Sequence, residues 1–429
     1  MEKYSSYKDI GVQWLGEIPS HWGLLKSKFL WRESFDTSAT GTEDLLSVSQ
    51  YDGVTPANGS RSESLVGYKV VEENNLVINI MLAWMGGLGV SAYNGLVSPA
   101  YCVYKLQGDN NPKYMHYLYK TPMYLAEFAR HSTGVIPSRW RMYTDDFGQV
   151  LTLIPPRKEQ DAMVAYLDAA TAKIDEAIAQ QQRMIDLLNE RKQVIIDMAA
   201  LHGLNPDVEM IDSGNDWIGL VPAHWRKNKF RYLFKTRTGI TFTKAQLEEE
   251  GEPVISYGQI HSKDNWGASV NPELIRHIPA LLTKGKEGAL AIPGDFLFAD
   301  TSEDFEGCGN NVFIDSEPVY AGYHTILAKK NNEEYGPYLA YLFTSTGWRG
   351  QLRSTVNGVK VYSITQTILN AANVVLPPID EQKAIADYIT ERVVKIDEGV
   401  KRHKEYIKAL QERKQIIIND VVTGKVKVV

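Results

Sequence analysis

The sequence predicts an α+β protein in which two tandem mixed α/β domains are separated by two long helices that pair as an antiparallel coiled coil. Three observations predict this fold class. A nine-residue phrase occurs twice, as WLGEIPSHW at 14–22 and as WIGLVPAHW at 217–225. A Pro-Pro motif followed by Glu-Gln also occurs twice, and each copy precedes a segment with apolar heptad spacing. Together they indicate an internal repeat whose halves are related by a pseudo-twofold axis.

The repeat covers nearly the whole chain. LIPPRKEQ at 153–160 matches VLPPIDEQ at 375–382, and ERKQVIIDM at 190–198 matches ERKQIIIND at 412–420. The offset grows from 203 to 222 positions, so the second copy carries 19 more residues before its Pro-Pro motif. We therefore expect a first variable domain at 1–154, a first helix at 155–203, a second variable domain at 204–376, and a second helix with a C-terminal tail at 377–429.

Each segment after a Pro-Pro motif predicts one helix of about 40 residues, about 60 Å long. Apolar residues alternate three and four positions apart, which is the seam of a coiled coil. Because a helix this long is not stable alone, the seam must be covered, most simply by the other copy. The predicted seam residues are Leu167, Ile174, Ile178, Ile185, Leu188, Ile389, Ile396, Val400, Ile407 and Leu410.

Polar residues interrupt this seam at Gln181, Lys192, His403 and Lys414. Two interpretations remain open for them. They form a hydrated layer in the helix pair, or they fix its register, as buried polar seam residues do in other coiled coils.

The variable domains also share a framework. NNLVINIMLAWMGG at 74–87 parallels PGDFLFADTSEDFEG at 293–307, and both predict an apolar strand that leads into a glycine-containing loop. YMHYLYKT at 114–121 parallels YLAYLFTS at 338–345, and both predict a short amphipathic helix. A repeated framework with different loops is the pattern expected of two recognition modules with different targets.

Composition excludes several classes of protein. The chain has 429 residues, 44% of them hydrophobic and 23% charged, without a run of 18 apolar residues that could span a membrane. The N-terminus has no apolar core of the signal-peptide type, and two cysteines provide neither a disulfide framework nor a four-ligand zinc site. These features predict a cytoplasmic protein. The net charge of −6 means that any nucleic-acid surface must be a local basic patch.

Motifs of catalytic sites are missing. The sequence has no glycine-rich phosphate loop, no G-x-S-x-G elbow and no H-E-x-x-H helix. The acidic residues Asp300, Glu303, Asp304 and Glu306 are interpreted as a solvated loop. His21 and His224 recur within the repeated phrase, each without a second metal ligand nearby, and are interpreted as packed histidines in a structural motif. We predict no catalytic residue and no metal site.

Basic and aromatic residues recur at similar places in both halves. Cationic side chains bind phosphates, and arginine also reads base edges, so this recurrence favours nucleic acid as the ligand. The predicted DNA-binding residues are Lys26, Lys28, Arg130, Arg139, Trp140, Arg141, Lys229, Arg231, Arg349, Arg353, Lys360 and Tyr362.

The phrase W-x-G-x-x-P-x-H-W, a variable domain, an L-P-P-x-x-E-Q helix that ends in E-R-K-Q, and the repetition of this plan resemble the specificity subunit of type I restriction–modification enzymes. The resemblance covers essentially residues 12–429. It implies two target-recognition domains separated by two conserved helices, and a subunit that is not itself catalytic. It also implies two adenine-methylating partner subunits that use S-adenosylmethionine, and two restriction/translocase subunits that use ATP and Mg²⁺. No cofactor is expected on this chain.

The duplication suits double-stranded DNA, whose backbone also has twofold axes. Two unlike recognition domains predict an asymmetric target, with two short specific segments around a non-specific gap of about 5–8 base pairs, because equivalent half-site centres lie about 10–10.5 base pairs apart.

Two other functions remain open from the sequence. The chain could be a standalone methyltransferase or nuclease, which would require a cofactor or metal motif that is not found. It could be a coiled-coil scaffold that binds only proteins, which would leave the recurring basic and aromatic loops without a role.

Overall fold

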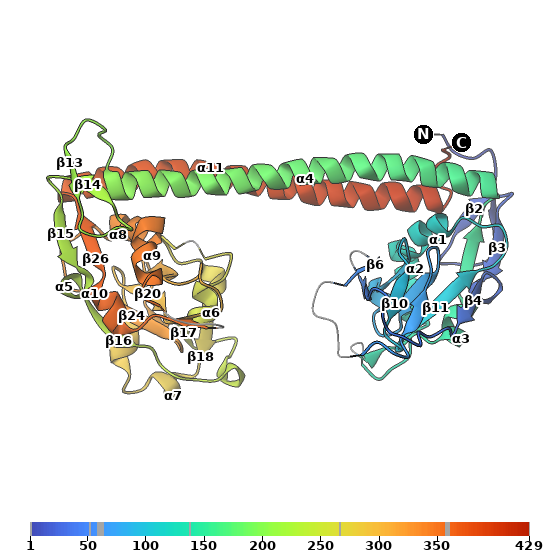
Figure 1. Ribbon diagram of the computed structural model, residues 1–429, viewed down its shortest axis with the longest axis horizontal. Helices are drawn as coiled ribbons and strands as arrows, with labels where there is room; N and C mark the ends of the chain where they lie inside the picture. Colours follow the sequence, from blue (N-terminus) through green and yellow to red (C-terminus); the bar gives the residue numbers. More distant parts are fainter. Residues whose placement is uncertain are drawn as a thin grey trace. The chain divides into compact units, whose positions relative to one another are not determined.

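The computed structural model describes residues 2–50, 53–57, 64–136, 139–265, 267–356 and 361–428. The chain forms two compact units: unit 1 comprises Met1–Gln182 and Lys404–Val429, and unit 2 comprises Arg183–His403. Each unit therefore contains one variable domain together with a segment of both long helices (Figure 1).

A four-stranded antiparallel sheet forms the centre of each variable domain. The strand order is β4-β11-β8-β9 in unit 1 and β16-β24-β20-β22 in unit 2. One middle strand of each sheet, β8 in unit 1 and β20 in unit 2, is almost entirely apolar and fully buried, which is typical of a strand covered on both faces. The strands are β4 (Trp31–Ser34), β8 (Leu76–Asn79), β9 (Leu88–Val90), β11 (Tyr101–Leu106), β16 (Phe234–Thr238), β20 (Phe296–Ala299), β22 (Asn311–Phe313) and β24 (Thr325–Lys330).

Smaller sheets complete both domains. Unit 2 has a second four-stranded sheet, of order β18-β17-β23-β19, which unit 1 replaces with two-stranded pairs. The additional residues of the second repeat copy fall in this region. The remaining strands of unit 1 are β1 (Tyr7–Asp9), β2 (Glu17–Pro19), β3 (Gly23–Lys26), β5 (Leu46–Ser49), β6 (Gly53–Pro56), β7 (Lys69–Val71), β10 (Gly95–Val97) and β12 (Leu151–Ile154). Those of unit 2 are β13 (Met210–Asp212), β14 (Leu220–Pro222), β15 (Arg226–Lys229), β17 (Glu252–Ile255), β18 (Arg276–Ile278), β19 (Leu290–Ala291), β21 (Thr301–Ser302), β23 (Val319–Ala321), β25 (Tyr362–Ser363) and β26 (Asn373–Leu376).

Three short helices follow each central sheet in the same order. Four of the six begin at a polar residue whose side chain accepts a backbone N–H, namely Asn111, Thr121, Ser345 and Thr365. The helices are α1 (Pro112–Tyr119), α2 (Pro122–Arg130) and α3 (Thr144–Gln149) in unit 1, and α8 (Gly336–Thr344), α9 (Thr346–Arg353) and α10 (Gln366–Ala371) in unit 2. Unit 2 also contains the one-turn helices α5 (Phe230–Leu233), α6 (Tyr257–Ile260) and α7 (Ala280–Thr283).

The two long helices are α4 (Arg157–His202, 46 residues) and α11 (Ile379–Val422, 44 residues). In unit 1 the first part of α4 pairs with the last part of α11, and Lys414 Nζ lies 2.7 Å from Asp175 Oδ1. In unit 2 the last part of α4 pairs with the first part of α11, and Lys192 Nζ lies 2.8 Å from Asp397 Oδ1. The helices are therefore antiparallel in both units, as the sequence predicts. The two ion pairs are also repeat equivalents, 222 positions apart.

The predicted seam residues differ in burial. Leu167, Ile185, Ile389, Ile396 and Leu410 are buried. The other five are half-buried, and most positions beside them are exposed.

A buried tyrosine in each unit connects the last strand of the variable domain to the C-terminal end of one long helix. In unit 1 the Tyr114 hydroxyl lies 3.3 Å from Leu153 O and 3.2 Å from Val422 O. Its equivalent in unit 2, Tyr338, lies 3.0 Å from Val375 O and 3.1 Å from Ala200 O. The carbonyls at the end of a helix have no intrahelical partner, so a buried hydroxyl stabilises them.

The repeated Trp phrase binds the first turn of a long helix. In unit 1 Trp22 Nε1 donates to Glu159 Oε2 at 3.1 Å, and His21 Nε2 lies 2.6 Å from Glu159 Oε1. In unit 2 Trp225 and His224 contact Glu381 in the same way, at 3.0 and 2.8 Å. Both histidines therefore have a structural partner.

The glutamine that follows each of these glutamates is buried. Gln160 Nε2 donates to Pro155 O, and Gln382 Nε2 donates to Pro377 O. The Glu-Gln pair thus explains why the Trp phrase and the Pro-Pro motif are repeated together.

Within the described residues, none of the helices combines the length and the apolar character that a membrane crossing requires.

Candidate nucleic-acid interface

Loops gather at one end of each central sheet, which we call the loop end. In unit 1 β4 ends, β11 begins, β8 ends and β9 begins at this end of the sheet, as the strand register shows. The loop 80–87 after β8 meets the segment 131–143 after α2, where Met142 N donates to Ile80 O at 3.0 Å. In unit 2 the loop 300–310 meets the segment after α9 in the same way, where Ile364 N donates to Asp300 O at 2.8 Å. The two loop ends therefore have one framework.

Aromatic side chains characterise the loop end of unit 1. The Trp84 and Trp140 rings meet edge to face, with centroids 5.4 Å apart. Thr133 and Arg141 exchange two backbone hydrogen bonds, and the Arg141 guanidinium donates to Trp140 O at 3.1 Å. Arg139 is exposed beside them. The structure thus brings Arg139, Trp140 and Arg141 together at one surface.

Arg130 lies at the end of α2 and is paired with a buried acid. Its guanidinium makes two hydrogen bonds to Glu127, at 2.8 and 2.6 Å. Burial raises the pKa of Glu127, but the Arg130 guanidinium outweighs burial, and the pKa lies below its ordinary value. Much of the charge of Arg130 is therefore neutralised within the protein.

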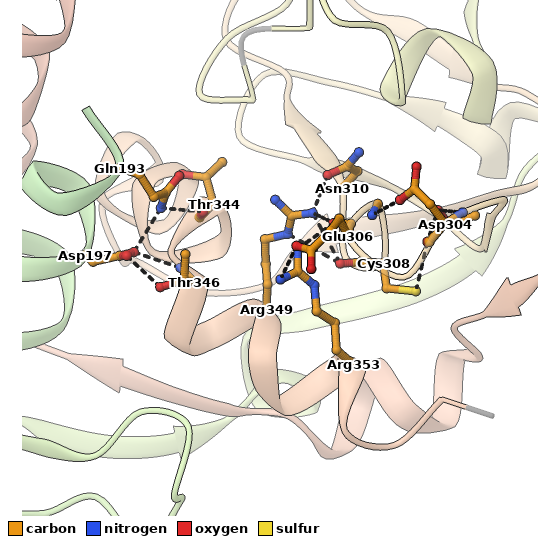
Figure 2. Close-up of polar contacts among 12 residues, drawn as sticks. Gln193, Asp197, Asp304, Glu306, Cys308, Asn310, Thr344, Thr346, Arg349 and Arg353 are labelled. Atoms are coloured by element: carbon orange, nitrogen blue, oxygen red, sulfur yellow. Dashed lines mark hydrogen bonds and ion pairs between the residues drawn. The ribbon is translucent and has the colours of Figure 1, made fainter. Parts of the chain in front are cut away.

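Two arginines of α9 bind the loop 300–310 in unit 2 (Figure 2). Arg349 donates to Asn310 Oδ1 at 2.6 Å and to the carbonyls of Glu306 and Cys308. Arg353 donates to the same Glu306 carbonyl, and its Nη1 lies 3.0 Å from Glu306 Oε2. Burial, reinforced by the neighbouring Arg353, lowers the pKa of Arg349 to about 10. Because loop acceptors occupy the Arg349 guanidinium, its geometry favours a role in positioning this loop.

The other predicted residues of this region are Tyr362 and Lys360. Tyr362 lies in β25 and packs edge to face on Phe305, with centroids 5.6 Å apart. Lys360 lies outside the described residues.

Four predicted basic residues lie at the opposite end of the sheets. Lys26 and Lys28 precede β4, and Lys229 and Arg231 precede β16. Lys26 Nζ donates to Gln149 Oε1 at 2.8 Å, and Lys229 Nζ donates to Ala371 O at 3.0 Å. The structure therefore does not bring these four residues together with the loop-end arginines.

The sequence-based selection did not include His261, Trp84 and Lys286, which also lie at the loop ends. A cavity of about 520 Å³ in unit 2 is lined by His261 and Tyr257 of the α6 region together with the loop 300–310 and the two arginines of α9. Trp84 precedes the Gly-Gly pair of its loop, which was the available signal in the sequence. Nothing in the sequence places His261 or Lys286 near the central sheet.

The acidic residues of the loop 300–310 support its own turns. Asp304 Oδ1 accepts the Gly307 N–H, and Asp300 Oδ1 accepts the Thr301 hydroxyl at 2.7 Å. Among the residues that the structure describes, no group of three or more His, Cys, Asp or Glu side chains could hold a metal ion.

Each of the two units thus consists of a mixed α/β domain, with a loop end, and a segment of both long helices. A family model for the type I restriction modification DNA specificity domain matches residues 222–407. The matched residues include most of the second variable domain and part of α11.

Known relatives agree with this assignment. The chain is 22% identical over 288 residues to the MjaVIII type I restriction enzyme specificity subunit of Methanocaldococcus jannaschii, across 66% of this chain and 63% of the relative. It is 23% identical over 213 residues to the EcoKI specificity subunit of Escherichia coli, across 48% of this chain and 44% of the relative. The chain thus matches less than two thirds of the length of these relatives.

A solved structure supports the fold. The structure, from a study of complex assembly and conformational transition of the type I R-M system, matches with a TM-score of 0.64 at 14% identity. The match covers 94% of this chain and 98% of that chain. These comparisons confirm the resemblance and the α+β fold class with two long helices. The chain is therefore similar to type I restriction enzyme specificity subunits in part of its sequence and in its fold.

Proposed function

We propose that this chain is the DNA-recognition subunit of a type I restriction–modification complex, and that each variable domain reads one half of an asymmetric, bipartite target. The observation that carries the proposal is the pair of loop ends, which share one framework and differ in side chains. Direct reading of bases depends on the side chains that reach the groove, so a shared framework with different side chains fits two different half-sites.

The paired long helices fit a role in setting the gap between the half-sites. A helix advances 1.5 Å per residue, and the helix pair is anchored at each of its ends by the Trp phrase and the buried tyrosine of one unit. Deleting one heptad from each helix should shorten the preferred gap and leave both half-sequences unchanged.

The helices also fit a role in docking two modification subunits. In unit 2 α4 exposes an apolar stripe at heptad spacing, formed by Met184, Leu187, Val194 and Met198. In unit 1 α11 exposes Tyr406 and Ile416, the repeat equivalents of Met184 and Val194. Exposed apolar residues at helical spacing favour a partner helix, and their recurrence at two equivalent positions of α4 and α11 favours two copies of one partner.

Under this proposal the chain makes and breaks no bonds itself. Adenine methylation with S-adenosylmethionine belongs to the modification subunits, and ATP- and Mg²⁺-dependent cleavage belongs to restriction/translocase subunits. All of them would act on DNA in the cytoplasm.

Mapping of methylated adenines in cells that express the chain with its modification subunits tests the proposal. We expect one two-part target. Arg139→Ala or Arg141→Ala should alter only its first half, and Tyr362→Ala only its second half. A single continuous motif, or a change of both halves by one substitution, would contradict two independent readers.

A further inference from the structure

A second cavity opens at the loop end of unit 2, and its chemistry differs from that of the first. It has a volume of about 540 Å³ and lies between the end of β16, the 285–289 loop and the start of α10. The first cavity is lined by Glu303, Asp304 and Glu306, and its two arginines already bind loop carbonyls. No carboxylate lines the second cavity, whose charged lining residues are Arg237 and Lys286.

Both cationic groups of this cavity are available to a ligand. Arg237 and Lys286 are exposed, and neither forms an ion pair within the described part of the chain. The nearest acid in sequence, Glu287, turns back to accept the Gly285 N–H at 3.1 Å. The Arg237 guanidinium lies across Gly288, where an added Cβ would be 3.1 Å from Nη1. A glycine at this position therefore leaves the room that the guanidinium occupies.

Neutral hydrogen-bonding groups complete the lining. Thr236 Oγ1 donates to Gln366 Oε1 at 3.0 Å, and Gln366 Nε2 donates to Thr238 Oγ1 at 2.9 Å. Because the Thr238 oxygen accepts this bond, its own hydrogen can be donated to a ligand. Two cations with an adjacent hydroxyl donor form the chemistry that binds a phosphate group.

The location of the cavity indicates which molecule would supply the phosphate group. Gln366 follows β25, and β25 pairs with β21, whose Ser302 lines the first cavity. The second cavity therefore borders the loops that we propose to read the second half-site. A polyanion that lies along this end of the sheet would place its backbone at Arg237 and Lys286.

We infer that the cavity formed by Arg237, Thr238, Lys286 and Gln366 is a binding site for the phosphodiester backbone of the DNA that carries the second half-site. The inference rests on the function proposed above. The equivalent surface of unit 1 is different: Ser34 stands at the position of Arg237 and donates to Asp36, and Lys105 is paired with Asp36 and Glu72. The site is therefore specific to unit 2.

Salt-dependent binding tests the site. The probes are a duplex that carries the mapped target and an unrelated duplex, bound by the full chain with its modification subunits over a range of KCl concentrations. Each phosphate contact contributes about 0.9 to the slope of log K against log salt concentration. Arg237→Ala and Lys286→Ala should each reduce this slope by about 0.9 and weaken binding about tenfold on both duplexes. The methylated motif should stay unchanged.

Two further variants make the result specific. Lys284→Ala removes the same charge from the same loop outside the cavity, and it should leave the slope nearly unchanged. Arg237→Gln keeps a polar group over Gly288 but removes the charge, so it should reduce the salt slope as much as Arg237→Ala does. If wild-type slope persists in both cavity variants, or if Lys284→Ala reduces it equally, the phosphate site is wrong. If the wild-type complex has no two-part target, the proposed function fails instead.

Discussion

The loop after the central strand is held by different contacts in the two units. In unit 1, Lys120 donates to Gly86 O at 2.8 Å and to Gln50 O at 3.0 Å, and Leu125 packs below Gly86. In unit 2 the position of Leu125 is taken by Arg349, whose guanidinium binds three acceptors of the loop 300–310. The helices and strands match, but an ammonium, a leucine and two tryptophans stabilise one loop, and two arginines stabilise the other.

The comparison shows where the duplicated halves were able to diverge. Contacts between the Trp phrase, the Glu-Gln pair and the helix ends are the same in both units. The contacts that set loop conformation differ. The side chains of the loop ends can therefore change while the contacts that attach each domain to the helices stay the same.

The largest expected effect is that of Arg349→Met. The substitution leaves the loop carbonyls and Asn310 without their donor, and we expect a loss of about 2–4 kcal/mol in unfolding free energy. Thermal denaturation measures this loss, and methylation mapping should show relaxed reading of the second half-site only. Leu125→Met at the equivalent position is the control and should cost less than about 1.5 kcal/mol. Equal effects of the two substitutions would remove the distinction between the loops.

The effects of replacing Glu159 and Glu381, the glutamates that the two Trp phrases contact, should differ in a predictable direction. Glu159 has three side-chain partners, since Tyr4 donates to it at 3.1 Å in addition to His21 and Trp22, whereas Glu381 has two. We expect Glu159→Ala to cost about 2–3 kcal/mol and Glu381→Ala about 1–2 kcal/mol, because each lost charged hydrogen bond contributes. Urea denaturation of both variants measures the difference. A larger loss for Glu381→Ala would contradict it.

A smaller effect is expected at a contact found in unit 2. Asp197 of α4 accepts the Thr346 N–H at 2.7 Å and so caps α9, the helix that carries both loop-binding arginines (Figure 2). Asn419 is its repeat equivalent in α11. Asp197→Ala should cost about 1 kcal/mol, as loss of a helix cap does, and Asn419→Ala should cost less. Hydrogen exchange at the start of α9 should increase in the first variant, and an unchanged rate would argue against the cap.

The smallest effects are expected for the two helix–helix ion pairs. Lys192→Ala and Lys414→Ala each remove one partly exposed pair, and each should cost about 0.2–1 kcal/mol. The two losses should agree closely, because the pairs are repeat equivalents. High salt should reduce both losses. Unequal losses in thermal denaturation would show that the two ends of the helix pair are not equivalent.

Much of this fold could be predicted from the sequence because the repeat supplies an internal comparison. The Pro-Pro motifs and the glycines after each helix bracket α4 and α11, and heptad spacing predicts their pairing. The structural interpretation of His21 and His224 agrees with their contacts to Glu159 and Glu381, but both side chains are exposed and not packed. Helical period and helix boundaries are local properties, so a single sequence contains them.

The residues of the loop ends were harder to predict, because the sequence does not show which group each charged side chain contacts. Arg349 lies in the short helix α9, and its guanidinium binds Asn310 and carbonyl oxygens. Arg139 follows the short helix α2, and it is exposed. Lys26 and Lys229 lie at the end of the central sheets opposite to the loop ends, because they precede the first strand of each sheet. His261 reaches the loop 300–310 through the tertiary fold, with its Nε2 2.7 Å from Thr301 O. These are long-range contacts, which local sequence patterns do not contain.

The antiparallel helix pair has a consequence for how the two halves can change with time. In each unit the variable domain contacts one helix segment from its own repeat copy and one from the other. In unit 1, Tyr117 donates to Asp168 of α4 and Tyr114 donates to Val422 O of α11; in unit 2, Tyr341 contacts Thr390 of α11 and Tyr338 donates to Ala200 O of α4. Mutations in the helices must therefore be compatible with both copies. A whole domain bounded by the Trp phrase and the Pro-Pro motif, in contrast, carries the residues that attach it to the helices. Exchange of complete domains by recombination is consequently a less disruptive route to a new DNA target than gradual substitution along the helices.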